Sequence, residues 1–110
     1  MTRFDVNRVV LNAVLVERAV LRTTPAGVAV LEMQLQHRSE TVEAGVPRTL
    51  DFSVDAMAIG EAARTLAAER LGAALRVSGF LAPRSQRSKR VVVHITQVER
   101  VPGESASGIR

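Results

Sequence analysis

Apolar and polar side chains alternate along much of this chain. Residues 28–38 carry apolar side chains at every second position from Ala29 to Leu35, with polar ones such as Glu32 between them. Alternation over this length is typical of an antiparallel strand with one buried face. The same pattern predicts strands over residues 48–56, 75–82 and 91–101, and a first strand is predicted over residues 7–17. In the range 48–56 the positions expected to face inward are Leu50, Phe52, Val54 and Ala56.

Turn and helix signals separate these strands. The stretch "TTPAGV" (23–28) has the Pro-Ala-Gly chemistry of a turn, and "SETVEAGVP" (39–47) predicts a longer polar loop. In residues 58–72 apolar side chains recur at helical spacing, which predicts a helix that Gly72 ends. The last residues, 102–110, are too polar to pack, so we expect a disordered tail after a folded domain over residues 1–101.

The resulting order is strand, strand, strand, helix, strand, strand. Five strands in this order, with a helix between the third and the fourth, are the elements of an OB-fold barrel. We therefore predict an all-β fold, a five-stranded OB-fold barrel with one helix between strands 3 and 4.

The first strand differs from the others because it is apolar on both faces. Its two apolar rows are Val9, Leu11, Ala13 and Leu15 on one side, and Val10, Val14 and Val16 on the other. An antiparallel strand with one solvated face should alternate instead. The second row therefore needs a cover, either from another copy of the chain in a homodimer or from loops of the same chain.

Composition excludes several kinds of chemistry. The chain of 110 residues has no Cys, which excludes a disulfide framework and Cys-ligated zinc and fits a reducing cytoplasm. The apolar stretch over residues 9–16 is too short to span a bilayer, so we expect no membrane association. His37 and His94 belong to no catalytic motif, and Asp51 and Asp55 are expected on a solvated strand face. We expect no enzyme, no metal site and no cofactor.

Basic residues concentrate in one short stretch, "PRSQRSKR" (83–90), between two predicted strands. It holds Arg84, Arg87, Lys89 and Arg90 and no acidic residue, in a chain whose net charge is only +4. Guanidinium groups bind phosphate in bidentate fashion, and the loop between strands 4 and 5 of an OB-fold lines its nucleic-acid groove. We expect this loop to clamp phosphate; the alternative is a solvated loop that serves solubility.

An aromatic residue lies at the root of that loop. Phe80 falls on the outer, polar face of the strand 75–82, where it is a candidate platform for base stacking. A bulge at Gly79 would instead turn Phe80 into the core. Three further arginines at strand ends are candidates to extend the cationic track: Arg22, Arg38 and Arg48.

Six stretches, in this order and spacing, carry a resemblance to a known family: "NRVVLNA", "TPAG", "LQHRSE", "EAG", "VSGF" and "VVHITQVE". From about Asn7 to Val101 the chain resembles primosomal replication protein N (PriB), a dimeric relative of bacterial single-stranded DNA-binding protein. The resemblance implies an OB-fold homodimer that binds single-stranded DNA in replication restart and bridges the helicase PriA and, where that protein exists, DnaT. By position it implies nucleic-acid contacts at Arg22, Arg38, Arg48, Phe80, Arg84, Arg87, Lys89 and Arg90.

The chain departs from that family after "EAG". Where the family often has stacking aromatic residues, including a Trp, this chain has Val46 and Asp51. We therefore expect DNA binding to depend on charge more than on stacking, with little sequence specificity. Two alternatives stay open: a protein-interaction adaptor with little DNA affinity of its own, and an OB protein for RNA or oligosaccharide.

Overall fold

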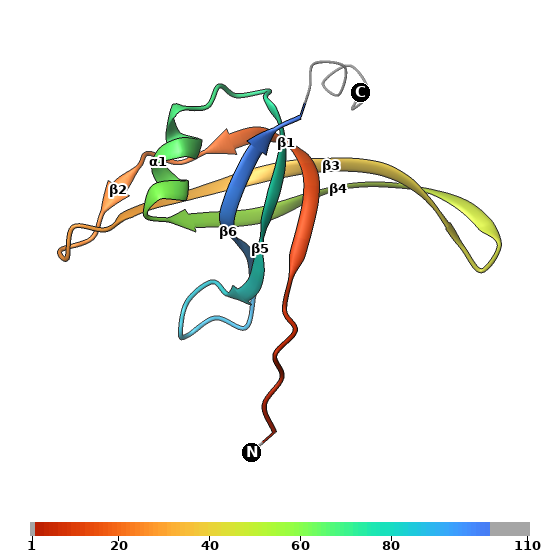
Figure 1. Cartoon of the computed structure of the whole chain (residues 1–110), viewed down its shortest axis with the longest axis horizontal. Helices are drawn as coiled ribbons and strands as arrows, with labels where there is room; N and C mark the ends of the chain where they lie inside the picture. Colours follow the sequence, from red (N-terminus) through yellow and green to blue (C-terminus); the bar gives the residue numbers. More distant parts are fainter. Residues whose placement is uncertain (1, 102–110) are drawn as a thin grey trace.

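Six strands and one helix make up residues 2–101, the part of the chain that the structure describes. In the computed structural model (Figure 1) they are β1 (Val9–Arg18), β2 (Arg22–Thr23), β3 (Ala29–Glu43), β4 (Val46–Ile59), α1 (Glu61–Ala68), β5 (Ala74–Pro83) and β6 (Val91–Arg100). The tail predicted over residues 102–110 lies outside the described residues.

The strands close into a barrel. The sheet order is β1-β5-β6-β4-β3-β2, and β1 also pairs with β3, which joins the two ends of the sheet. Strand β2 is a short addition next to the "TTPAGV" turn, so the other five strands are the predicted ones and α1 lies between the predicted strands 3 and 4. The five-stranded OB-fold barrel expected from the element order is confirmed.

The barrel interior is filled by the apolar rows of the alternating strands. Leu31 and Leu35 of β3, Leu15 of β1, and Leu75 and Val77 of β5 are fully buried. Burying one such side chain stabilises a fold by roughly 1.5–3 kcal/mol. Helix α1 lies at one end of the barrel (Figure 1) and adds its two buried side chains, Ala63 and Leu66, to this core.

Helix α1 is shorter than the sequence predicts. It ends at Ala68, because the backbone of Glu69 is already extended and the Arg18 guanidinium donates hydrogen bonds to the carbonyl oxygens of Leu66 and Glu69. Gly72 therefore does not end the helix, and its left-handed backbone (φ 91°) lies in the following loop. Within residues 2–101 no helix is long and apolar enough to cross a membrane.

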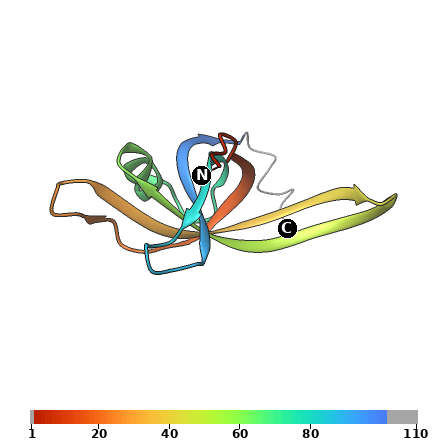
Figure 2. The ribbon, with the colours of Figure 1, turned by 90° about the horizontal axis from the view of Figure 1, so that it is seen from below.

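The polar loop predicted over residues 39–47 is wrong. Strands β3 and β4 continue through this range and stay paired up to Glu43 and Val46. The two residues between them, Ala44 (φ 53°) and Gly45 (φ 79°), both have positive φ, as a two-residue hairpin turn requires. On β3, Gln36 is the last residue paired with β1, so residues 37–52 form an extended hairpin that projects beyond the barrel (Figure 2).

This projection corrects the placement of Phe52. Its row continues the inward face of β4, but the extended hairpin has left the barrel, and Phe52 is 42% exposed. Phe52 packs on His37, its cross-strand partner, with ring centroids 5.1 Å apart. The His37 imidazole donates a hydrogen bond from Nδ1 to the backbone oxygen of Asn12, at 2.7 Å, which ties the base of the extended hairpin to β1.

The two faces of β1 have different surroundings. Ala13 and Leu15 on the inner face are fully buried, whereas Val10 is 53% exposed and Val16 is 38% exposed on the outer face. Along its first half β1 pairs with β5, and the side chain of Asn7 prolongs this pairing by exchanging two hydrogen bonds with the backbone of Leu81. The outer apolar row of β1 is thus partly open in a single copy of the chain.

Candidate nucleic-acid interface

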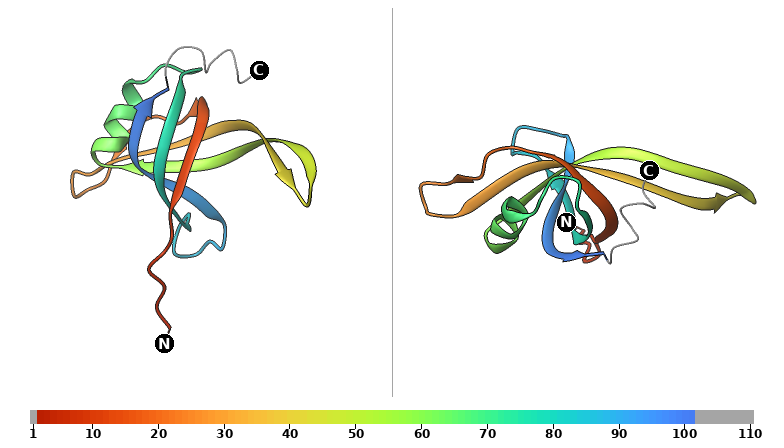
Figure 3. Two further views of the ribbon diagram at one scale, coloured as in Figure 1. Left: turned by 45° about the vertical axis from the view of Figure 1, so that its right-hand side comes forward. Right: turned by 90° about the horizontal axis from the view of Figure 1, so that it is seen from above.

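The basic stretch forms the loop that joins β5 to β6. Pro83 and Val91 are the last residue pair of the two strands, and the basic loop, residues 84–90, begins with a hydrogen bond of 2.8 Å from Arg84 N to Arg90 O. A second backbone bond, from Ser88 N to Ser85 O, makes a turn at the tip. The basic loop and α1 lie on opposite sides of the β3–β4 ribbon (Figures 2 and 3).

A groove lies beside the basic loop, on the outer face of β3 and β4. Its cavity has a volume of about 440 Å³. The lining residues come from the end of β1, from β3 and β4, from the loop after α1, from the first residue of the basic loop and from the start of β6. They include Glu17, Glu32, Gln34, Asp55, Met57, Arg84 and Val92. This is the face on which OB-folds bind oligonucleotides. Here its floor carries carboxylates.

Three of the predicted phosphate-binding arginines are paired with these carboxylates. Glu32 accepts from two of them: its Oε1 lies 2.7 Å from Arg84 Nη2, and its Oε2 lies 3.2 Å from Arg22 Nη2. Asp55 Oδ2 lies 2.5 Å from Arg90 Nη2. The structure therefore brings Arg22, Arg84 and Arg90 together at the groove, and the expectation that Asp55 lies on a merely solvated face is wrong.

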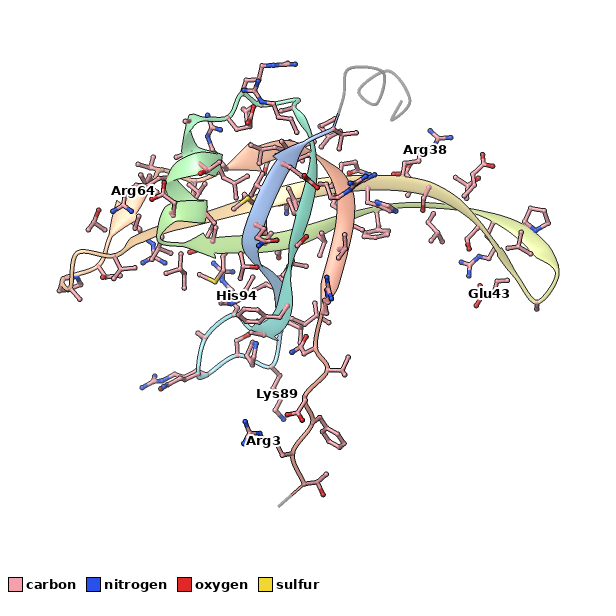
Figure 4. All side chains as sticks on the ribbon, viewed as in Figure 1. Arg3, Arg38, Glu43, Arg64, Lys89 and His94 are labelled. Atoms are coloured by element: carbon pink, nitrogen blue, oxygen red, sulfur yellow. The ribbon has the colours of Figure 1, made fainter. Side chains whose placement is uncertain are left out.

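The other two cations of the basic loop are differently placed. Arg87 and Lys89 are exposed, and neither forms an ion pair with any residue between 2 and 101. Lys89 points away from the barrel in Figure 4. Their charges are available to a polyanion without the loss of an internal contact.

The two remaining arginines lie on the extended hairpin rather than at the groove. Arg48 pairs with Glu43 close to the turn. The side chains of Arg38 and Glu43 project from opposite faces of the extended hairpin, as Figure 4 shows. On β3 Arg38 is six residues beyond Glu32, which at about 3.3 Å per residue is about 20 Å along the strand. These arginines do not join the cluster around the basic loop.

Phe80 lies on the outer face of the barrel, as its alternation predicts. It is 38% exposed and stacks on His94 of β6, with ring centroids 5.2 Å apart and planes at 21°. The pairing of β5 with β6 does shift at Ser78 and Gly79, but this bulge leaves Phe80 outside. Met57 of β4 is the neighbour of His94 on the other side. Phe80 and His94 thus continue the groove floor as an aromatic surface.

Sequence reasoning missed the role of Glu32, Asp55 and His94. Alternation places Glu32 and Asp55 on the outer strand faces, and His94 falls on the outer face of β6 in the same way. Alternation shows that these side chains lie on the outer face of the sheet, but it does not show which side chains they contact. The pairing of Glu32 with Arg84 joins residues 52 positions apart, which only the closed barrel brings together.

Comparison with known proteins identifies the family. A family model described as "another single-strand binding protein family" matches residues 7–97. The replication restart protein PriB of Bordetella pertussis is 42% identical over 97 residues, which are 88% of this chain and 91% of that protein. The chain belongs to the PriB family. The resemblance that the six sequence stretches carry is confirmed.

Solved structures agree with this membership. The PriB structure from Ralstonia solanacearum matches this PriB-family chain with a TM-score of 0.79 at 38% identity, over 87% of this chain and 98% of that one. The single-stranded DNA-binding protein of Thermus aquaticus matches with a TM-score of 0.72 at 23% identity, over 91% of this chain and 52% of that one. The second match shows the shared barrel fold.

Proposed function

We propose that this PriB-family chain binds single-stranded DNA as an accessory protein of replication restart, mainly through the basic loop. One observation carries the proposal: a loop with four cations and no acid stands at the edge of the face that OB-folds use for oligonucleotides. The names of its relatives, replication restart protein PriB, supply the process. The chain performs no catalytic step in this role and needs no cofactor or metal.

The proposed binding depends on charge first and on stacking second. Arg87 and Lys89 meet the phosphates, and Arg84, Arg90 and Arg22 follow along the groove. Phe80, backed by His94, offers one stacking surface for a base, which is worth roughly 1–3 kcal/mol in comparable proteins. Arg38 and Arg48 extend the contact to DNA that runs along the extended hairpin. Because these groups meet the backbone and the base faces, little sequence specificity follows.

The proposed functional unit is a homodimer that acts in the cytoplasm. Its support is the outer face of β1, where Val10 and Val16 are exposed and Val14 is half-buried. A second copy that covers this row would bury apolar surface at about 25 cal/mol per Å². In this dimer two basic loops become available to one DNA strand. Sedimentation equilibrium tests the state directly: a monomer at micromolar concentration contradicts the proposal.

We further propose that the chain bridges the restart helicase PriA to other primosome components, including DnaT where that protein exists. A second candidate function, an adaptor with little DNA affinity, is favoured by one observation. Three groove arginines already have a carboxylate partner in Glu32 or Asp55, and these two negative charges weaken the attraction of the groove for phosphate. In the adaptor function the basic loop would grip an acidic surface of a partner protein instead.

Fluorescence anisotropy of a labelled dT oligonucleotide, measured at several salt concentrations, tests the DNA-binding function. The wild type should show an affinity that falls with salt by about 0.7 log units per log unit of salt for each phosphate neutralised. The variant Arg84→Ala/Arg87→Ala/Lys89→Ala/Arg90→Ala should lose most of both affinity and slope. Absence of binding by the wild type at low salt would leave the adaptor function as the better account.

A further inference from the structure

Two acids on the groove floor, Glu32 and Asp55, hold the basic loop through ion pairs with its arginines. We propose that Glu32 and Asp55 form a latch that keeps the basic loop folded over the groove and competes with phosphate for Arg22, Arg84 and Arg90. The inference rests on the proposed DNA binding for its role. The attachment of the loop to two carboxylates does not depend on DNA binding, because it is observed as contacts within the chain.

Glu32 connects the two sides of the groove. Its two carboxylate oxygens are divided between Arg84 of the basic loop, at 2.7 Å, and Arg22 of β2, at 3.2 Å. Phosphate offers a guanidinium the same kind of contact, an anionic oxygen in the plane of its N–H groups. Glu32 therefore occupies with its own oxygens the place where a phosphate between Arg22 and Arg84 would bind.

Asp55 holds the other end of the basic loop in an oriented contact. The Gln34 side chain donates from Nε2 to Asp55 Oδ1 at 3.0 Å, which leaves Oδ2 to accept from Arg90 at 2.5 Å. The Asp55 side chain is only 25% exposed and that of Glu32 only 35%. Their arginine partners are more than half exposed, so the ion pairs are only partly shielded from solvent and can open.

The two attachment points are the two ends of the basic loop. Arg84 and Arg90 are its first and last residues, and they are also joined to each other by the backbone bond from Arg84 N to Arg90 O. Arg87 and Lys89 at the tip are left outside the latch. DNA can thus meet the tip at no internal cost, whereas entry into the groove requires the ion pairs of Glu32 and Asp55 to break. The latch lowers affinity and couples groove binding to movement of the loop.

A matched pair of double variants separates the latch from simple charge. The latch variant is Glu32→Gln/Asp55→Asn. The control is Glu40→Gln/Asp51→Asn, which removes the same two charges from the same outer face of β3 and β4. Among residues 2–101, neither Glu40 nor Asp51 contacts a cation of the basic loop. Asp51 instead accepts a hydrogen bond from the side chain of Gln36. All four are near-isosteric changes at positions that are not buried, and thermal melting checks that both variants are folded.

The first measurement needs no DNA. Limited trypsin digestion, followed by mass spectrometry, gives the rate of cleavage after Arg87 and Lys89 relative to cleavage after Arg3 in the exposed N-terminal segment. Release of the loop should raise this relative rate by about 2- to 30-fold in the latch variant, the factor expected for loss of the two partly exposed ion pairs that hold the loop. The control should stay within about twofold of the wild type. Equal rates in wild type and latch variant would overturn the latch, whether or not the protein binds DNA.

The second measurement is the affinity for the dT oligonucleotide. The latch variant should bind more tightly than the wild type by a further several-fold beyond any gain in the control. An equal gain in both variants would show that only the summed charge matters, and would overturn the competition with phosphate. If the wild type fails to bind and the latch variant binds, the competition is supported and the wild-type groove is closed under those conditions.

Discussion

The molecule has two projecting hairpins, and they are built in opposite ways. The extended hairpin, residues 37–52, keeps its backbone ladder to the last pair and turns in two residues, Ala44 and Gly45. The basic loop, residues 84–90, has no ladder and is held by side chains that reach back to the groove floor. The extended hairpin is long, and its charges nearly balance, with two arginines and three acidic residues. The basic loop is short and carries only positive charges.

The difference shows that charge and reach are separate properties of a binding surface. The extended hairpin projects far from the barrel, but Arg48 is paired with its neighbour Glu43 and contributes little field. The basic loop concentrates charge, but Glu32 and Asp55 restrain its two ends. Polyanion binding should therefore begin at the unpaired tip, Arg87 and Lys89, and the extended hairpin should contribute less. Four experiments test or sharpen this contrast.

The largest effect should come from the root of the basic loop. A Cβ added at Gly79 would lie 1.7 Å from the backbone oxygen of His94 and 2.8 Å from its carbonyl carbon. Backbone atoms within a paired strand cannot move away cheaply, so Gly79→Ala should lower the free energy of unfolding by about 3 kcal/mol. Urea denaturation measures this loss. Ser78→Ala is the neighbouring control and should cost less than about 1 kcal/mol; equal costs would contradict the close contact.

The next largest effect should separate the cations of the two hairpins. Removing the four cations of the basic loop should weaken dT binding by at least about tenfold at moderate salt, because several phosphate contacts are lost together. Arg38→Ala/Arg48→Ala should weaken it by less than about threefold, since Arg48 already has a carboxylate partner. Anisotropy titrations measure both. Arg64→Ala/Arg70→Ala removes two charges from the α1 side and should have the smallest effect. A larger loss from the extended hairpin than from the basic loop would reverse the proposed order.

Two phenylalanines allow the same comparison for stacking. Phe80 lies on the outer face beside the groove, whereas Phe52 lies on the face of the extended hairpin that continues the barrel interior. Phe80→Ala should weaken binding of the dT oligonucleotide by roughly 1–3 kcal/mol, and Phe52→Ala by less than about 0.5 kcal/mol. Equal losses would mean that DNA follows the inner face of the extended hairpin rather than the groove.

The smallest effect concerns the turn of the extended hairpin. Ala44 has a left-handed backbone (φ 53°), which costs free energy in a residue other than Gly, Asn or Asp. Ala44→Asn should raise the free energy of unfolding by about 0.5 kcal/mol. Thermal or urea denaturation detects the change. Ser39→Asn places the same side chain in an ordinary strand position of the extended hairpin and should not stabilise; a gain there equal to that at Ala44 would argue against turn strain.

Alternation and element order are enough to predict the barrel, the inner and outer faces of its strands, and the place of the basic loop. Alternation reports burial directly, because successive side chains of a strand point to opposite faces. Alternation places Leu31 and Leu35 in the core and Phe80 on the outer surface, where the structure has them. Alternation failed over residues 39–47, where both faces of the extended hairpin meet solvent and no apolar row marks the strand.

The contacts between side chains depend instead on how the strands are assembled into the barrel. The length of β3 and β4 beyond the barrel makes Phe52 exposed, although its row is buried four residues later on β4, at Ala56. Barrel closure decides that Arg84 meets Glu32 and that Arg90 meets Asp55, pairs that lie 52 and 35 positions apart in the chain. Local patterns carry no information about such distances, because the contacts depend on how the strands are ordered around the barrel.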